Sequence, residues 1–338
     1  MALEDWTAAA GVLETFRNAY PDHALQREAT RQIAYAYRQS GQLTRSADEY
    51  DRLASQSDDP AVRGEALLTA GDLYAQSGAG DRAVDAYRRY VEAFPRPIEP
   101  ALETRFKIAE IRKTANDEPL YLKELAEIVR IDAEAGSERT ARTRTLAARS
   151  ALVLAEQVYR AALAVKLTQP FETSLQEKKR RMDAAIEAMD RLVAYEIAEV
   201  TAAATFYMAE TYFDFSRSLA ESERPADLAS ADLEEYELAL KKEEAPFAQK
   251  ALDLHQKNLE LLRAGVLDPW TENSLAKLVE RMPARYARGE QSSGVLGAMD
   301  IYAYRTPASQ IYGPAMSLAH PAPPAGPVQA TRLTTEAR

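Results

Sequence analysis

The chain repeats a pattern of aromatic, glycine and proline residues at a step of 37 positions, and this repeat restricts its fold more than any other feature. Tyr74 lies four residues before Gly78, and Tyr37 lies four residues before Gly41. A repeat of this length is one supersecondary unit that needs neighbouring copies to bury its apolar face. The same step relates Tyr87 to Tyr50 and Ala83 to Ser46, and twice the step relates Ala83 to Ala9 and Pro95 to Pro21.

The recurring residues are of the types that a pair of closely packed helices requires. Gly71 and Ala83 are small, so two helices of one unit can approach closely there, and Tyr74 and Tyr87 fill the space left between units. The closing prolines cannot donate to a helix and disfavour a helical residue before them. The glycines that end the first helix of each unit tolerate a left-handed cap, and they are Gly41 and Gly78.

The repeats define three predicted segments. Residues 1–135 hold the repeats, of which the first is truncated: Ala9, Leu13, Phe16 and Pro21 match a second helix only. We therefore expect the chain to be a fragment of a longer protein, cut inside a repeat; the alternative is that Met1–Tyr20 is a capping helix. A weaker third unit begins near Phe106 and reaches Asn116 at an offset of 38 from Gly78.

Residues 136–288 read as a degenerate array of longer helices, and residues 289–338 as a disordered tail. Helices are predicted from Ser137 and over 173–196, 202–221 and 231–244, with Pro246 opening another over 247–264 and Trp270 opening a last short one. The tail is rich in Pro, Ala, Ser and Thr and cannot bury enough apolar area to offset chain entropy.

Composition supports an all-helical chain and disfavours several functions. Good helix formers dominate, the net charge is −10, and Cys is absent. An acidic chain argues against nucleic-acid binding, and no apolar run reaches the ~18 residues of a membrane span. The one basic run, Lys178–Arg181, is interpreted as the solvated face of a helix.

The sequence shows no group of residues with the types and spacing of a catalytic, metal-binding or cofactor-binding site. The three histidines, His23, His255 and His320, are not at metal-ligand spacing, and no nucleophile elbow or phosphate-binding loop occurs. We interpret His255 as a surface or helix-packing residue, and the acidic clusters as solvated. The sequence therefore predicts a protein that is not an enzyme and binds no cofactor.

Residues 64–95 resemble a tetratricopeptide repeat (TPR). The resemblance rests on Leu67, the Ala70–Gly71 pair, Tyr74, Ala83, Tyr87 and Pro95, with Leu67 replacing the usual Trp and Tyr87 the usual Phe. It implies an all-α superhelix (α-solenoid) of antiparallel helix pairs. The paired Lys and Asn with which such domains clamp a terminal carboxylate are absent, which argues against binding of chaperone tails.

The segment from residue 133 to residue 286 resembles the carboxy-terminal part of large TPR proteins of proteobacteria that are associated with the cell envelope. This resemblance implies a periplasmic or outer-membrane-associated scaffold if a signal peptide was truncated, and otherwise a cytoplasmic one. The stretches that carry it are 133–142, 222–225, 235–237, 246–247 and 283–286.

The TPR resemblance also predicts a binding surface, because the first helix of each unit lines the concave face. The predicted partner-binding residues are Arg31, Tyr35, Arg38 and Gln39 in one unit and Leu68, Asp72 and Gln76 in the next. Arg and Tyr often anchor interfaces. We expect a protein or peptide partner, which includes components of an envelope complex. The alternatives are a substrate-recruiting or regulatory arm of a larger enzyme, and a self-assembling structural element.

Overall fold

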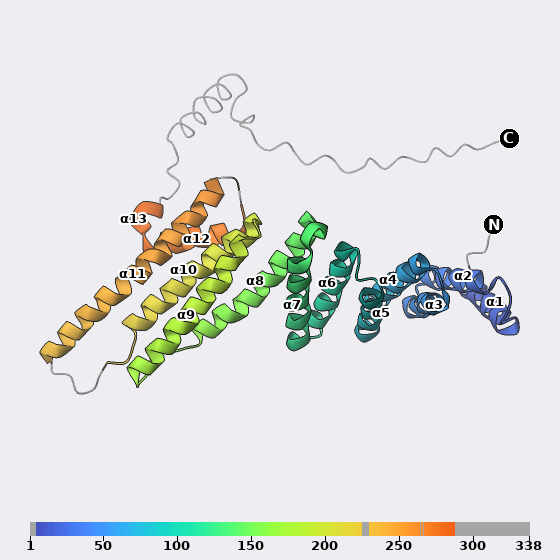
Figure 1. Cartoon of the computed structure of the whole chain (residues 1–338), viewed down its shortest axis with the longest axis horizontal. Helices are drawn as coiled ribbons and strands as arrows, with labels where there is room; N and C mark the ends of the chain where they lie inside the picture. The colour runs from blue at the N-terminus through green and yellow to red at the C-terminus, as the bar shows by residue number, and fades with distance from the viewer. Residues whose placement is uncertain (1–4, 225–229, 264, 266, 288–338) are drawn as a thin grey trace, which may run out of the picture. The chain divides into compact units, whose positions relative to one another are not determined.

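A computed structural model describes residues 5–224, 230–263, 265 and 267–287, and this part of the chain contains helices and no strand (Figure 1). The chain divides into two compact units, Met1–Leu278 and Val279–Arg338. The all-α, TPR-like fold predicted from the sequence is therefore confirmed for the described residues. The predicted tail at 289–338 lies outside them, and the predicted domain boundaries stay predictions.

The first seven helices pack in chain order, each against its neighbours. Helix α1 (Trp6–Ala19) packs on α2, and three helix pairs follow. The pairs are α2 (Gln26–Gln39) with α3 (Leu43–Gln56), α4 (Pro60–Gln76) with α5 (Gly80–Ala93), and α6 (Ile98–Thr114) with α7 (Glu118–Glu134).

The same tight turn joins the two helices of each of these pairs. Gly41, Gly78 and Asn116 adopt positive φ angles of 75°, 79° and 56°. In each turn the amide of this residue donates to the carbonyl three residues back, and the next amide donates five residues back, as in Gly78 to Ala75 and Ala79 to Tyr74. This pattern satisfies carbonyls that a helix end leaves open. The weaker third unit predicted around Asn116 thus has the same turn as the other two.

Small residues and tyrosines fill the joins between these helices, as predicted. Ala83, Tyr74 and Tyr87 are buried in one core cluster. The hydroxyls of the tyrosines reach carboxylates: Tyr74 donates to Asp48 of α3 at 2.7 Å, and Tyr37 donates to Glu14 of α1 at 2.6 Å. These two hydrogen bonds each join a first helix to the helix before it, because the positions are equivalent in the repeat.

Longer helices follow. They are α8 (Ala141–Leu163), α9 (Phe171–Val193), α10 (Ala198–Ala220), α11 (Ser230–Arg263), α12 (Pro269–Arg281) and the short α13 (Pro283–Tyr286). Helix α8 packs on α6, α7, α9 and α10, and α10 packs on α11.

Two predicted helix boundaries in this region are wrong. The helix expected from Ser137 starts at Ala141, because Thr140 forms a capping box with Thr143, while Gly136–Glu138 form a separate 3₁₀ turn. Pro246 was expected to separate two helices but lies inside α11. Proline in a helix costs ~3 kcal/mol. On the C-terminal side of Pro246, α11 packs on α10, and the ring centroids of Phe247 and Phe215 lie 4.5 Å apart. This packing offsets the cost of the proline.

The interpretation of Lys178 as solvated is also wrong. Its side chain is 2% exposed, and Nζ donates to the carbonyls of Ala162 and Val165 at the end of α8 and to Asp214 of α10. The next residues of the basic run behave as expected, since Lys179 and Arg180 are exposed. Lys178 therefore joins three helices.

Candidate functional site

The four predicted residues on α2 lie together on its exposed side, and the structure adds a fifth from α1. Arg31, Tyr35, Arg38 and Gln39 are exposed. The ring of Tyr35 remains 46% exposed although it meets the Trp6 ring edge-on, at 5.6 Å between centroids. We call these five residues the α2 surface. Sequence reasoning missed Trp6 because it stands before the first matched repeat position.

The charged groups of the α2 surface are largely available. Arg31 forms an ion pair of 3.2 Å with Glu28 on its own helix, and both side chains are about half exposed. The Arg38 guanidinium forms no hydrogen bond or ion pair with the residues that the structure describes. An exposed pair of this kind contributes little to stability, so both guanidinium groups can bind an incoming carboxylate at small cost.

The three predicted residues on α4 have different surroundings. Gln76 is exposed. Leu68 is only partly exposed and packs against the core cluster around Tyr87. Asp72 accepts hydrogen bonds from the Tyr87 hydroxyl at 2.5 Å and from Lys107 Nζ of α6 at 2.6 Å. Leu68 and Asp72 therefore have structural roles within the array that the sequence pattern does not reveal.

Ion pairs connect the first helices of successive units. Asp72 on α4 meets Lys107 on α6 at 2.6 Å, Glu103 on α6 meets Arg142 on α8 at 2.8 Å, and Arg149 on α8 meets Glu199 on α10 at 2.8 Å. All six side chains are about half exposed, so each pair contributes ~0–1 kcal/mol. These pairs engage charged residues on each of α4, α6, α8 and α10, whereas the Arg38 guanidinium on α2 has no charged partner among the described residues.

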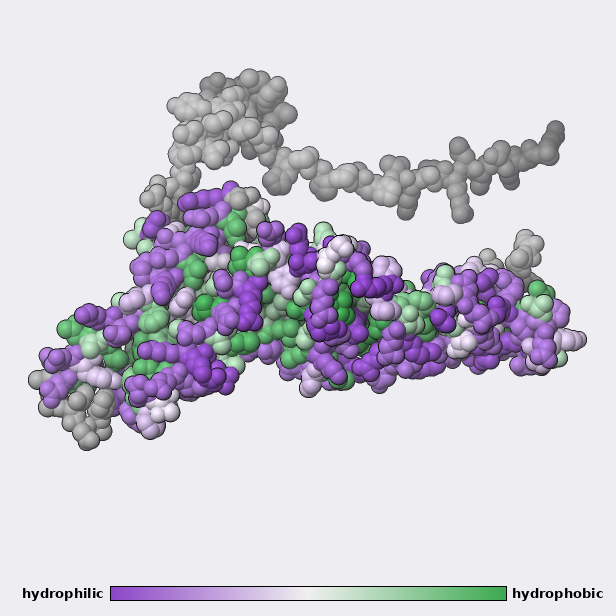
Figure 2. Space-filling view, in the orientation of Figure 1, coloured by the Kyte–Doolittle hydropathy of each residue, from purple (hydrophilic) through white to green (hydrophobic). Residues whose placement is uncertain are grey.

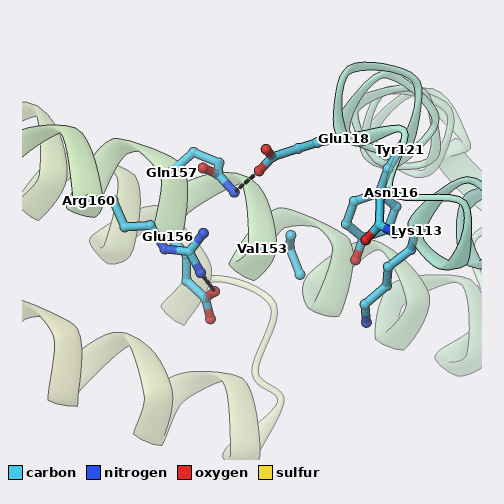
Figure 3. A pocket seen from close by; sticks show the side chains of 8 residues that line it. All are labelled: Lys113, Asn116, Glu118, Tyr121, Val153, Glu156, Gln157 and Arg160. Atoms are coloured by element: carbon cyan, nitrogen blue, oxygen red, sulfur yellow. Dashed lines mark hydrogen bonds and ion pairs between the residues drawn. The ribbon is translucent and has the colours of Figure 1, made fainter.

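A pocket of about 420 Å³ lies where the 17-residue α6 and α7 meet the 23-residue α8 (Figure 3). Tyr121 and Val153 provide its apolar surface, and Lys113 and Arg160 lie on opposite sides of it. Burial raises the pKa of Tyr121 above its ordinary value, so its hydroxyl stays protonated at neutral pH. The remaining lining residues are Asn116, Glu118, Glu156 and Gln157.

Ser274, His255 and Glu210 form a chain of hydrogen bonds with the residue types of a hydrolase triad, but a different arrangement. His255 Nδ1 lies 3.2 Å from Ser274 Oγ, and Nε2 lies 3.3 Å from Glu210 Oε1. His255 and Ser274 are 0% exposed, so no substrate reaches the hydroxyl. Burial raises the pKa of Glu210, but His255 and Lys277 outweigh it and keep that pKa below its ordinary value. The cluster joins α10, α11 and α12, the helix-packing role that the sequence analysis allowed for His255.

The described residues contain no cluster of three or more His, Cys, Asp or Glu side chains arranged to hold a metal ion. None of their helices combines the length and the apolar character that crossing a membrane needs.

Residues 65–96 match the family model of the tetratricopeptide repeat. Among solved structures, a tetratricopeptide repeat protein from Parabacteroides merdae is 16% identical, with a TM-score of 0.30 over 80% of this chain and 91% of that chain. BtubC (BKLC) from P. vanneervenii is 14% identical, with a TM-score of 0.30 over 80% of this chain and 94% of that chain. No curated protein matches the sequence.

The matched segment corresponds to most of α4, the turn at Gly78 and α5. The helix pairing, the turn and the buried small and aromatic residues of this segment agree with the match. The chain therefore contains a tetratricopeptide repeat at residues 65–96, within an all-helical array of paired helices.

Proposed function

We propose that this protein is an interaction scaffold that holds a segment of another protein on the α2 surface. The observation that supports this most is the contact of Trp6 with an exposed Tyr35, with the exposed Arg38 on the same helix as Tyr35. Trp, Tyr and Arg are the residue types that dominate interface hot spots. Tyr35 is large, held by Trp6, and still 46% exposed. Such a side chain loses little conformational freedom when a partner covers it.

The charge of the surface indicates the chemistry of the partner. Arg31 and Arg38 lie on one face of α2, at positions i and i+7, and Tyr35 lies between them. Two guanidinium groups beside an aromatic ring favour a segment with carboxylates next to an apolar or aromatic side chain. We therefore propose an acidic, partly apolar segment as the bound element.

The test is a pulldown with a charge-matched control. Arg31→Glu with Arg38→Glu reverses the two charges of the α2 surface, and Arg180→Glu with Arg191→Glu makes the same change in net charge on α9, where both arginines are exposed and pair within their own helix. We expect the α2 variant to lose capture of the partner about 10-fold or more, and the α9 variant to keep it. Equal capture by both variants would discard the α2 surface.

The cellular context of the scaffold is a second part of the proposal. The resemblance of residues 133–286 to envelope-associated proteins supports a place in a bacterial cell-envelope complex. Fractionation of the native cells with an antibody to this chain tests it, because recovery in the cytoplasmic fraction alone contradicts it. The other reading, an arm of a larger enzyme, requires a catalytic domain in the full reading frame.

A further inference from the structure

Helix α1 carries an apolar face that the described residues cover only in part, where the His23 ring lies 5.3 Å from the Phe16 ring and 6.5 Å from the Tyr20 ring, centroid to centroid. It consists of Ala9, Val12, Phe16 and Tyr20 at the C-terminal end, and we call it the α1 outer face. Val12 is 70% exposed and Tyr20 is 59% exposed. The adjacent side of the helix packs on α2 through Ala10, which is fully buried, and through Trp6 and Leu13. Figure 2 shows a few apolar residues among hydrophilic ones at the end where α1 lies.

The repeat register identifies what this face is built to contact. Two steps of 37 residues relate Ala9 to Ala83, Val12 to Ala86, Phe16 to Tyr90 and Tyr20 to Phe94. In α5, Ala83 and Ala86 are 0% exposed, because α4 packs on α5. The α1 outer face is therefore the counterpart of the side of α5 that receives a first helix.

The aromatic residues of the two faces are also arranged alike. The rings of Phe16 and Tyr20 lie 5.6 Å apart with an interplanar angle of 39°. The rings of Tyr90 and Phe94 lie 5.4 Å apart with an angle of 38°. The aromatic pair of α1 thus already has the geometry that its counterpart has under α4.

The contacts of Tyr90 and Phe94 show which helix such a pair receives. Gly64 of α4 lies over it, since a Cβ atom on residue 64 would stand 3.4 Å from Phe94 Cε2 and 3.5 Å from Tyr90 Cε2. The Arg63 guanidinium lies 5.5 Å from the centre of the Phe94 ring. Two turns further on, α4 presents its second glycine, Gly71, to α5.

We propose that the α1 outer face docks an amphipathic helix of a partner protein, with an Arg-Gly step over Phe16 and Tyr20 and a small residue two turns later. A second copy of this chain is not the occupant we propose, because its first helices α2, α4 and α6 already pack on α3, α5 and α7. This site is separate from the α2 surface and does not depend on it.

A peptide with the sequence of α4, residues 59–76, provides a defined probe. With the peptide labelled at its N-terminus, fluorescence anisotropy measures its affinity for the full chain. We expect saturable binding that Val12→Arg weakens about 10-fold or more, because the charge would be buried. Thr15→Arg, on an exposed part of α1 outside the face, should leave the affinity within about twofold.

Peptide variants test the small residue. A peptide with Gly64→Leu gains helix propensity yet should bind about 10-fold more weakly, because the added side chain meets the aromatic pair. A peptide with Glu65→Leu, altered at an exposed position of α4, should bind like the original. Circular dichroism confirms that the Val12→Arg chain is folded.

Three results would overturn the proposal. The first is that the peptide does not bind. The second is that Val12→Arg and Thr15→Arg change its affinity equally, which would indicate that the peptide displaces α4 or binds nonspecifically. Alternatively, sedimentation velocity shows a dimer of the chain that Val12→Arg dissociates, which would make a second copy the occupant. Loss of partner capture by the Arg31 and Arg38 variant has no bearing on these outcomes.

Discussion

Gly71 lies directly under the ring of Tyr87, so that a Cβ atom on residue 71 would stand 2.4 Å from Tyr87 Cε1. Atoms do not approach this closely, so residue 71 has to be glycine for Tyr87 to keep its place. Tyr87 in turn donates its hydroxyl to Asp72, the residue next to Gly71. The close approach of α4 and α5 depends on this contact.

Gly71→Ala should therefore lower the free energy of unfolding by about 1–3 kcal/mol, although alanine is the better helix former. Gly11→Ala is the matched control, because Gly11 is also inside a helix but a Cβ there meets nothing within 4 Å. The control should raise stability by up to ~1 kcal/mol. Urea unfolding followed by circular dichroism measures both, and equal effects of the two substitutions would show that Tyr87 does not restrict residue 71.

Lys178→Met should cost about 3 kcal/mol or more. The substitution removes the ammonium group that binds Asp214 and the carbonyls of Ala162 and Val165. Among the described residues it leaves the buried Asp214 with Arg217 as its remaining charged partner. Lys179→Met, one residue along on the exposed face, should change stability by less than about 0.5 kcal/mol. Thermal unfolding of the two variants side by side measures the difference. A small effect at Lys178 would mean that the pair does not form.

The sequence predicted the paired helices well because their signals are local. Gly41 and Gly78 mark turns whose backbone angles few other residues adopt. Gly71 and Tyr87, which contact each other, belong to the same repeat unit. Each such signal spans a few residues, so the periodicity alone locates the helices. The match of residues 65–96 to the repeat falls on the unit with the clearest of these signals.

The sequence predicted less where a contact joins helices far apart in the chain. Lys178 and Asp214 are 36 residues apart, and nothing in a run of basic residues shows which one turns inward. Lysine has an apolar stem, so its position on a helix face does not decide burial. In the predicted binding site, the pattern does not show that Asp72 pairs with Lys107, which lies on the next unit.

Glu196→Gly should stabilise the protein by about 0.5–1 kcal/mol. Glu196 has a φ of 55° in the connection between α9 and α10, a conformation that costs a non-glycine residue ~1–2 kcal/mol. Glycine removes this cost, but its greater freedom in the unfolded chain offsets part of the gain. Its ion pair with Arg144 is 3.7 Å long and largely exposed, so little is lost with it. Glu196→Gln removes the charge but keeps the strain, and it should give no gain in denaturant unfolding. A gain in the Gln variant equal to that of the Gly variant would assign the effect to charge.

Stability should fall as the pH rises above about 10, the ordinary pKa of tyrosine. Burial, followed by the hydrogen bond to a carboxylate, raises the pKa of Tyr37, Tyr74 and Tyr87 above that value. Below pH 10 these hydroxyls are protonated in both the folded and the unfolded chain, so their contribution is fully present. Above it the unfolded chain loses protons that the folded chain retains, and the free energy of unfolding decreases.

Tyr74→Phe separates this effect from the titration of lysines in the same range. At pH 8 the variant should be less stable by about 1 kcal/mol, because the hydrogen bond to Asp48 is lost. Between pH 10 and 11.5 its stability should fall less steeply than that of the unchanged protein, by at most about 1.4 kcal/mol per pH unit, the limit for one proton. Denaturant unfolding at four pH values measures the two slopes. Parallel slopes would mean that Tyr74 ionises as readily in the folded protein as in the unfolded chain, and that its hydroxyl is not held by Asp48.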